Sequence, residues 1–175
     1  MKKLTYIIIT PLFLIGLIFS FNYFMLQNPL NKELKKDERN EGINIGVHYK
    51  YYILTNELVY DIKSIKEDKA PLDMFRVFLT SAKYFKEKTF NKVELASRSN
   101  SKFYITGEYY KLLGIEFEEQ NPIYTLRTFP ENVYLLDGTK AYEEWSGGLF
   151  AVLKSQMEDV MDFNKKWYID DFSKQ

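Results

Sequence analysis

The chain has 175 residues, and its 24 Lys and Arg residues are balanced by 24 Asp and Glu. It has no cysteine and one histidine, which excludes disulfides and the common zinc sites, because those sites need several Cys or His ligands. The balanced charge also argues against nucleic-acid binding, which depends on neutralising phosphates. We therefore expect no metal, no cofactor and no nucleic-acid partner.

Residues 4–26 form an apolar stretch without a charged residue, directly after Lys2 and Lys3. As a helix rising about 1.5 Å per residue, this stretch would reach roughly 34 Å, enough to cross a hydrocarbon core of about 30 Å. The alternative is a cleaved signal peptide ending at Ser20. The apolar run continues past Ser20, however, and Ile18 is a poor residue for a cleavage site. We predict that residues 1–27 are a membrane anchor or uncleaved signal that contacts the bilayer through residues 4–26.

The orientation of this anchor depends on its flanks. Two lysines precede it, whereas four basic residues lie among residues 31–41, so a count of positive charges alone would place the domain in the cytoplasm. Acidic residues dilute that second cluster, and a short N-terminus with immediate lysines is typical of an exported chain. We expect a single pass of the inner (cytoplasmic) membrane of a bacterium, with the C-terminal domain on the non-cytoplasmic side.

The anchor is followed by a charged tether over residues 28–42, and residues 43–175 have the length of one globular domain. Alternating apolar residues predict two strands within residues 45–65, with a turn near Asn56. Pro71 then opens a predicted helix, because its fixed φ and missing N–H suit the first helical position. The same alternation of apolar residues predicts a hairpin made of residues 93–98 and 102–106.

The second half of the domain predicts a helix over residues 107–119, strands over 123–129 and 133–136, and a long final helix. That helix begins near Ala141 or Ser146, ends at Tyr168, and carries an apolar stripe that includes Trp145 and Trp167. These elements predict an α+β fold. One N-terminal transmembrane helix is followed by a largely antiparallel sheet, with two or three helices packed on one face.

Candidate chemistry is sparse. His48 lies in a predicted strand, and a catalytic triad would need it beside a nucleophile and an acid. The carboxylates occur mainly as runs on predicted helices, where adjacent residues do not face each other. We therefore predict no catalytic residue and no metal ligand. The densest mixture of aromatic and charged residues predicts a binding surface made by Arg98, Lys102, Tyr104, Arg127 and Glu131.

These patterns favour a non-catalytic, membrane-tethered envelope protein whose domain binds another envelope protein. One alternative is an envelope enzyme that uses carboxylates with Arg or Tyr on cell-wall or glycan substrates, which would need two acids across a cleft. A second alternative is an immunity-type protein that binds an effector outside the cytoplasm.

Overall fold

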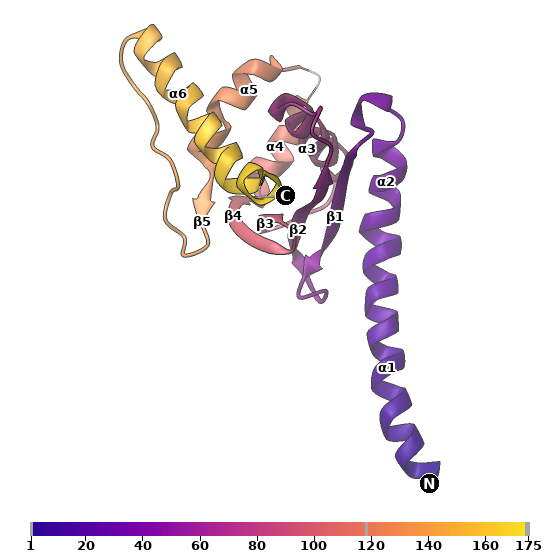
Figure 1. Ribbon diagram of the computed structural model, residues 1–175. Coiled ribbons are helices and arrows are strands. Elements are labelled where there is room, and N and C mark those ends of the chain that lie inside the picture. Colours follow the sequence, from indigo (N-terminus) through magenta and orange to yellow (C-terminus); the bar gives the residue numbers. More distant parts are fainter. Residues whose placement is uncertain (1, 118, 174–175) are drawn as a thin grey trace.

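A five-stranded sheet forms the centre of the domain, and its strand order follows the chain, β1-β2-β3-β4-β5 (Figure 1). The computed structural model describes residues 2–117 and 119–173, with side chains from Pro11 onward. Neighbouring strands pair antiparallel, except β2 and β3, which are parallel and joined through helix α3. The α+β class is therefore confirmed, with one parallel pair in the sheet. The strands are β1 (Ile43–Lys50), β2 (Leu54–Ile65), β3 (Lys92–Ser97), β4 (Asn100–Thr106) and β5 (Tyr134–Leu135).

Two well-defined helices match the predicted ones. Helix α3 (Pro71–Phe85) begins at Pro71, and the Asp73 carboxylate accepts a hydrogen bond from the Ala70 N–H, which closes its first turn. The final helix α6 (Leu149–Asn164) is shorter than predicted and continues through a π turn, η4 (Lys165–Ile169), into α7 (Asp170–Phe172). Between them lie α4 (Gly107–Glu116), α5 (Pro122–Thr128) and the 3₁₀ turn η3 (Phe129–Asn132).

The core is an aromatic cluster on one face of the sheet. Tyr60 of β2 contacts Phe78 of α3 and Trp167 of η4, with ring centroids 5.0 and 6.2 Å apart. Phe163 of α6 contacts Trp167 and Phe103 of β4. Because α3, η4 and α6 all reach this cluster, the helices that close the domain share one face of the sheet, as a two-layer fold requires.

Three local predictions were wrong. The first turn lies at Tyr51 and Tyr52, both with positive φ, and Asn56 lies inside β2. The predicted strand over residues 123–129 is helix α5, because Asn121 caps it and Pro122 occupies its first turn. The strand expected over residues 133–136 is reduced to the two residues of β5.

The N-terminal segment is one long helix rather than an anchor followed by an irregular tether. Helix α1 (Lys2–Asn22) runs through a π turn, η1 (Tyr23–Gln27), into α2 (Asn28–Leu34), and a 3₁₀ turn η2 (Glu38–Asn40) leads to β1. Leu26, Leu30 and Leu34 are spaced four residues apart and are buried in the core cluster. The predicted tether therefore contributes to the folded domain.

The first part of this helix extends well beyond the domain (Figure 1). Between Leu12 and Met25 its large apolar side chains are mostly exposed, at 44–65%. The helix is long and apolar enough to cross a membrane. The domain therefore leaves most of the apolar surface of this part of the helix exposed.

Helix and sheet are joined by two side-chain amides that cap the free edge of β1. Gln27 accepts from the Val47 N–H at 2.7 Å and donates to the Ile45 carbonyl at 2.8 Å, as a neighbouring strand would. Asn22, only 3% exposed, accepts from the Tyr49 N–H and donates to the Tyr52 carbonyl, both at 2.8 Å.

The π turn explains how both amides face the same strand. Residues five apart lie about 140° apart around an α-helix. The π turn, closed by the Asn28 N–H and the Tyr23 carbonyl, holds an extra residue per turn and reduces that angle. The edge of β1, which would otherwise be open to pairing with other chains, is thereby covered.

We expect Asn22→Leu to lower the free energy of unfolding by about 1–3 kcal/mol, because it leaves the Tyr49 N–H without a partner in a buried position. Hydrogen exchange of the Tyr49 amide in the detergent-solubilised protein measures this directly, and exchange should become faster. Asn44→Ala is the control, because Asn44 is exposed and bonds only the Ser64 hydroxyl across the hairpin. Unchanged protection of Tyr49 would contradict the role assigned to Asn22.

Candidate functional site

The predicted surface residues fall into separate groups. Arg98 lies in the β3–β4 turn with its guanidinium 4.4 Å from the centroid of the Phe172 ring. Lys102 of β4 forms a 2.5 Å ion pair with Asp171, and both side chains are less than a third exposed. These two residues thus hold the C-terminal helix α7 against the hairpin.

The other three predicted residues have different partners. Tyr104 of β4 stacks on Tyr134 of β5, with ring centroids 5.2 Å apart. In α5, Arg127 lies over the ring of Tyr124 at 5.2 Å.

Glu131 of η3 accepts a hydrogen bond from the Gln156 amide of α6 at 2.5 Å. The partners described above differ between the two sets: Arg98, Lys102 and Tyr104 contact Phe172, Asp171 and Tyr134, whereas Arg127 and Glu131 contact Tyr124 and Gln156. The predicted set therefore consists of a hairpin group and a helical group, each fastened to its neighbours.

Two buried carboxylates on the sheet escaped the sequence prediction. Glu94 of β3, 4% exposed, forms a 2.5 Å ion pair with Lys50 and accepts from the Ser101 hydroxyl. Asp61 of β2 is fully buried, pairs with Lys63 and accepts from the Ser99 N–H. The sequence signal for each of them was a single acidic residue within the alternating pattern of a predicted strand. Both carboxylates are ion-paired and hydrogen-bonded, so their buried charges are compensated by partners within the sheet.

A groove lies where α2, η2 and β1 meet, and it includes Asp37, Glu38 and Glu41. The Asp37 side chain is 33% exposed and receives three hydrogen bonds from the Arg39 guanidinium, which with the Arg39 N–H lower its pKa to about 2. A general acid needs a raised pKa, so Asp37 is unsuited to that role. Glu41, a second carboxylate of the groove, forms an exposed ion pair with Lys66, whose ammonium lies 3.4 Å from the carboxylate.

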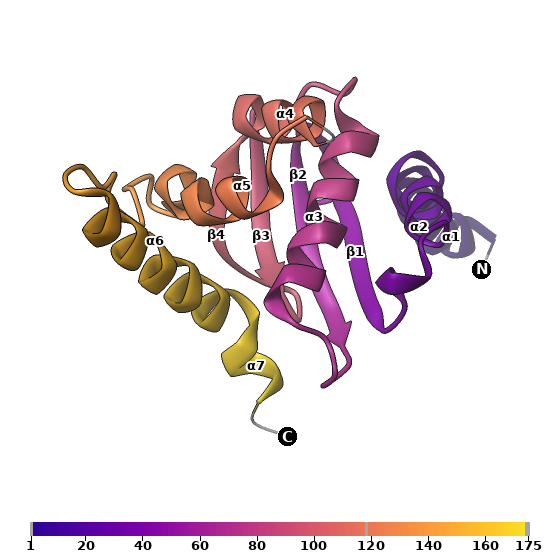
Figure 2. The same cartoon turned by 90° about the horizontal axis from the view of Figure 1, so that it is seen from above.

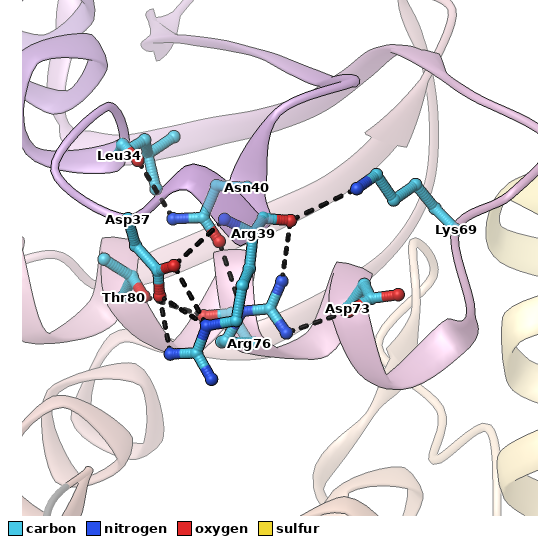
Figure 3. A network of polar contacts seen from close by, with 8 residues as sticks. All are labelled: Leu34, Asp37, Arg39, Asn40, Lys69, Asp73, Arg76 and Thr80. Carbon is cyan, nitrogen blue, oxygen red and sulfur yellow. Dashed lines mark hydrogen bonds and ion pairs between the residues drawn. The ribbon is translucent and has the colours of Figure 1, made fainter.

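The same region fastens the N-terminal helix to α3 (Figure 3). Arg76 of α3 donates to the Asn40 side chain, the Arg39 carbonyl and the Asp73 carboxylate at 2.8–3.2 Å. Asn40 in turn donates to the Leu34 carbonyl at the end of α2. These bonds favour a structural role for the polar residues around this groove.

His48 of β1 is the single histidine. Its Nδ1 lies 2.8 Å from the Tyr49 carbonyl, and its ring stacks on Tyr52 with centroids 4.3 Å apart. Within residues 2–117 and 119–173, no cluster of three His, Asp or Glu side chains has the arrangement of a metal site.

Helix α6 carries several highly exposed apolar side chains, among them the most exposed large one of the described residues, Phe150. Phe150 is 86% exposed, Leu149 67% and Met161 61%. Phe150, Met157 and Met161 are seven and four residues apart, which places them along one face of the helix. Val160 and Phe163 on the other side are buried.

Helix α5 packs beside α6 and adds exposed Ile123 and Tyr124. We call the residues Ile123, Tyr124, Leu149, Phe150, Met157 and Met161 the α6 surface.

No protein-family model matches this chain, no curated protein matches it, and no solved structure matches it.

Proposed function

We propose that this chain is a single-pass membrane protein of the bacterial cell envelope that binds another envelope protein through the α6 surface. The anchor is helix α1, and the bound partner lies on the non-cytoplasmic side of the inner membrane. The proposed role is non-catalytic, in keeping with the ion-paired carboxylates of the sheet.

The position of the α6 surface carries this proposal. Helix α1 lies beyond β1 at one end of the sheet, and α6 lies beyond β4 at the other, in both views (Figures 1 and 2). The N-terminal end of α6, where Phe150 is found, is remote from the part of α1 that extends away from the domain. A bilayer around α1 is therefore out of reach for this end of α6, which favours a protein as its partner.

The composition of the α6 surface supports a protein partner as well. Aromatic side chains and methionine are enriched at protein interfaces, and flexible methionines adapt to the shape of a partner. Phe150, Met157 and Met161 follow one helix face, as in the packing of an amphipathic helix against a partner. An effector bound outside the cytoplasm, as for an immunity-type protein, is one form of this proposal.

The orientation rests on Lys2 and Lys3 before the anchor. A C-terminal fusion to a phosphatase that works only outside the cytoplasm should be active, and a fluorescent protein that folds only in the cytoplasm should stay dark. The reverse pattern would overturn the placement of the domain.

Photo-crosslinking in intact cells tests the α6 surface. A photoreactive residue in place of Phe150 should give a discrete crosslinked product, and Met161→Asp in the same chain should remove it, because a buried charge is costly at an apolar contact. Ile115 is the control position, since it is 50% exposed on α4 and does not belong to the α6 surface. Equal crosslinking from positions 115 and 150, or a product that survives Met161→Asp, would contradict the proposed binding surface.

A further inference from the structure

We infer that the tip of the β1–β2 hairpin is a second membrane contact, which enters the interfacial layer of the bilayer beside helix α1. This inference rests on the membrane anchor of the proposed function and adds a lipid-binding element within the domain itself. The tip comprises residues 51–54, Tyr-Tyr-Ile-Leu.

The tip is exposed and apolar at a place where soluble hairpins carry polar turn residues. Tyr51 is 71% exposed, Ile53 61% and Leu54 40%. Tyr51 and Tyr52 have φ values of 51° and 65°, in the left-handed region that Asn and Gly occupy most easily. Two tyrosines therefore occupy a strained backbone, and such strain is concentrated at functional positions.

The tip lies against the apolar part of α1 rather than beside its polar end. The Tyr52 ring contacts Phe19 with centroids 4.5 Å apart, and the Asn22 amide donates to the Tyr52 carbonyl. A shallow groove between them is lined by Leu17, Ile18, Phe21, Tyr52, Ile53 and Thr55. The hairpin and α1 also point to the same side of the domain (Figure 1).

The depth of the tip follows from its level on the helix. Residues 17–21 lie one to five residues before Asn22, which bonds the edge of β1, and this corresponds to about 2–8 Å along a helix. Interfacial elements bury their apolar faces by about 5–10 Å. If α1 spans the bilayer, the tip therefore reaches the boundary between headgroups and acyl chains.

The residue types at this level match that boundary. Tyrosine is enriched at membrane interfaces because its ring is apolar and its hydroxyl is polar. Tyr23, which is 49% exposed on the helix, lies near the same level as Tyr51 and Tyr52.

Single-cysteine labelling tests this contact without background, because the chain has no cysteine. Full-length Ile53→Cys, labelled with an environment-sensitive fluorophore, is placed in vesicles of phosphatidylethanolamine and phosphatidylglycerol. We expect a blue-shifted emission and a loss of fluorescence when the lipids carry a quencher on the upper acyl chain. Asp68→Cys, in the exposed loop at the other end of β2, should show neither effect.

Leu14→Cys, in the exposed apolar part of α1, separates this inference from the anchor itself. A label shielded from water at position 14 together with a water-exposed label at position 53 would overturn the hairpin contact and leave the anchor standing. A water-exposed label at position 14 would overturn both. A label at position 53 that is shielded from water but not quenched by lipid would show a protein in the groove, which also overturns the lipid contact.

Discussion

Replacing Trp167 with alanine is expected to lower the free energy of unfolding by about 3–5 kcal/mol, the range for large aromatic truncations in protein cores. Trp167 is 1% exposed and lies between Tyr60, Phe78 and Phe163, so the cavity would open at the centre of the core. The substitution also removes the hydrogen bond from the indole N–H to the Ala96 carbonyl. Urea unfolding of the detergent-solubilised protein, followed by near-ultraviolet circular dichroism, measures the loss.

The second tryptophan is the matched control. Trp145 is 41% exposed and precedes α6, and we expect Trp145→Ala to change the free energy of unfolding by less than about 1 kcal/mol. Similar losses for both variants would mean that the contacts of Trp167 do not hold η4 on the sheet.

Gly107→Ala is expected to cost about 3 kcal/mol or more, the upper end of the range for overpacked sites. A Cβ atom at residue 107 would lie 1.7 Å from the Phe90 carbonyl oxygen, and this neighbour belongs to the backbone. The overlap therefore requires β4 and α4 to move away from the segment before β3. Thermal unfolding of the variant should show a clearly lower midpoint, with the helical content retained at low temperature.

Gly16→Ala is the control for this substitution, because nothing lies within 4 Å of a Cβ at that position. It should leave the unfolding of the domain unchanged. A Gly107→Ala variant as stable as the Gly16→Ala variant would show that the approach of Phe90 to residue 107 is looser than the structure describes.

Elements with strong local signals were predictable from sequence. Pro71 and the apolar positions after it predicted α3, and the stripe that includes Trp167 predicted the final helix, because both patterns report a single buried face. Helix α5 was mistaken for a strand because its aromatic and β-branched residues favour strands. Its start signal, Asn121 followed by Pro122, was present and was the stronger cue.

The remaining features depend on contacts between distant segments, which periodicity does not report. Tyr51 and Tyr52 carry none of the usual turn residues, and their turn is fastened by Asn22, about 30 positions earlier. The predicted surface joined Arg127 to Arg98 because Arg127 was assigned to a strand beside the hairpin, whereas it lies on α5. The exposed Phe150 lay outside the predicted apolar stripe and was not singled out, since sequence alone does not tell which side of α6 remains uncovered.

The π turn at residues 23–27 has a mechanical consequence for the whole molecule. If α1 is the proposed anchor, any rotation of α1 in the bilayer turns the sheet and α6 through the same angle, because a continuous helix joins α1 to the domain. The π turn would then set both the height of the domain above the bilayer and its rotation about the helix axis. A partner would therefore meet the α6 surface in one fixed orientation, without the range of orientations that a flexible linker allows.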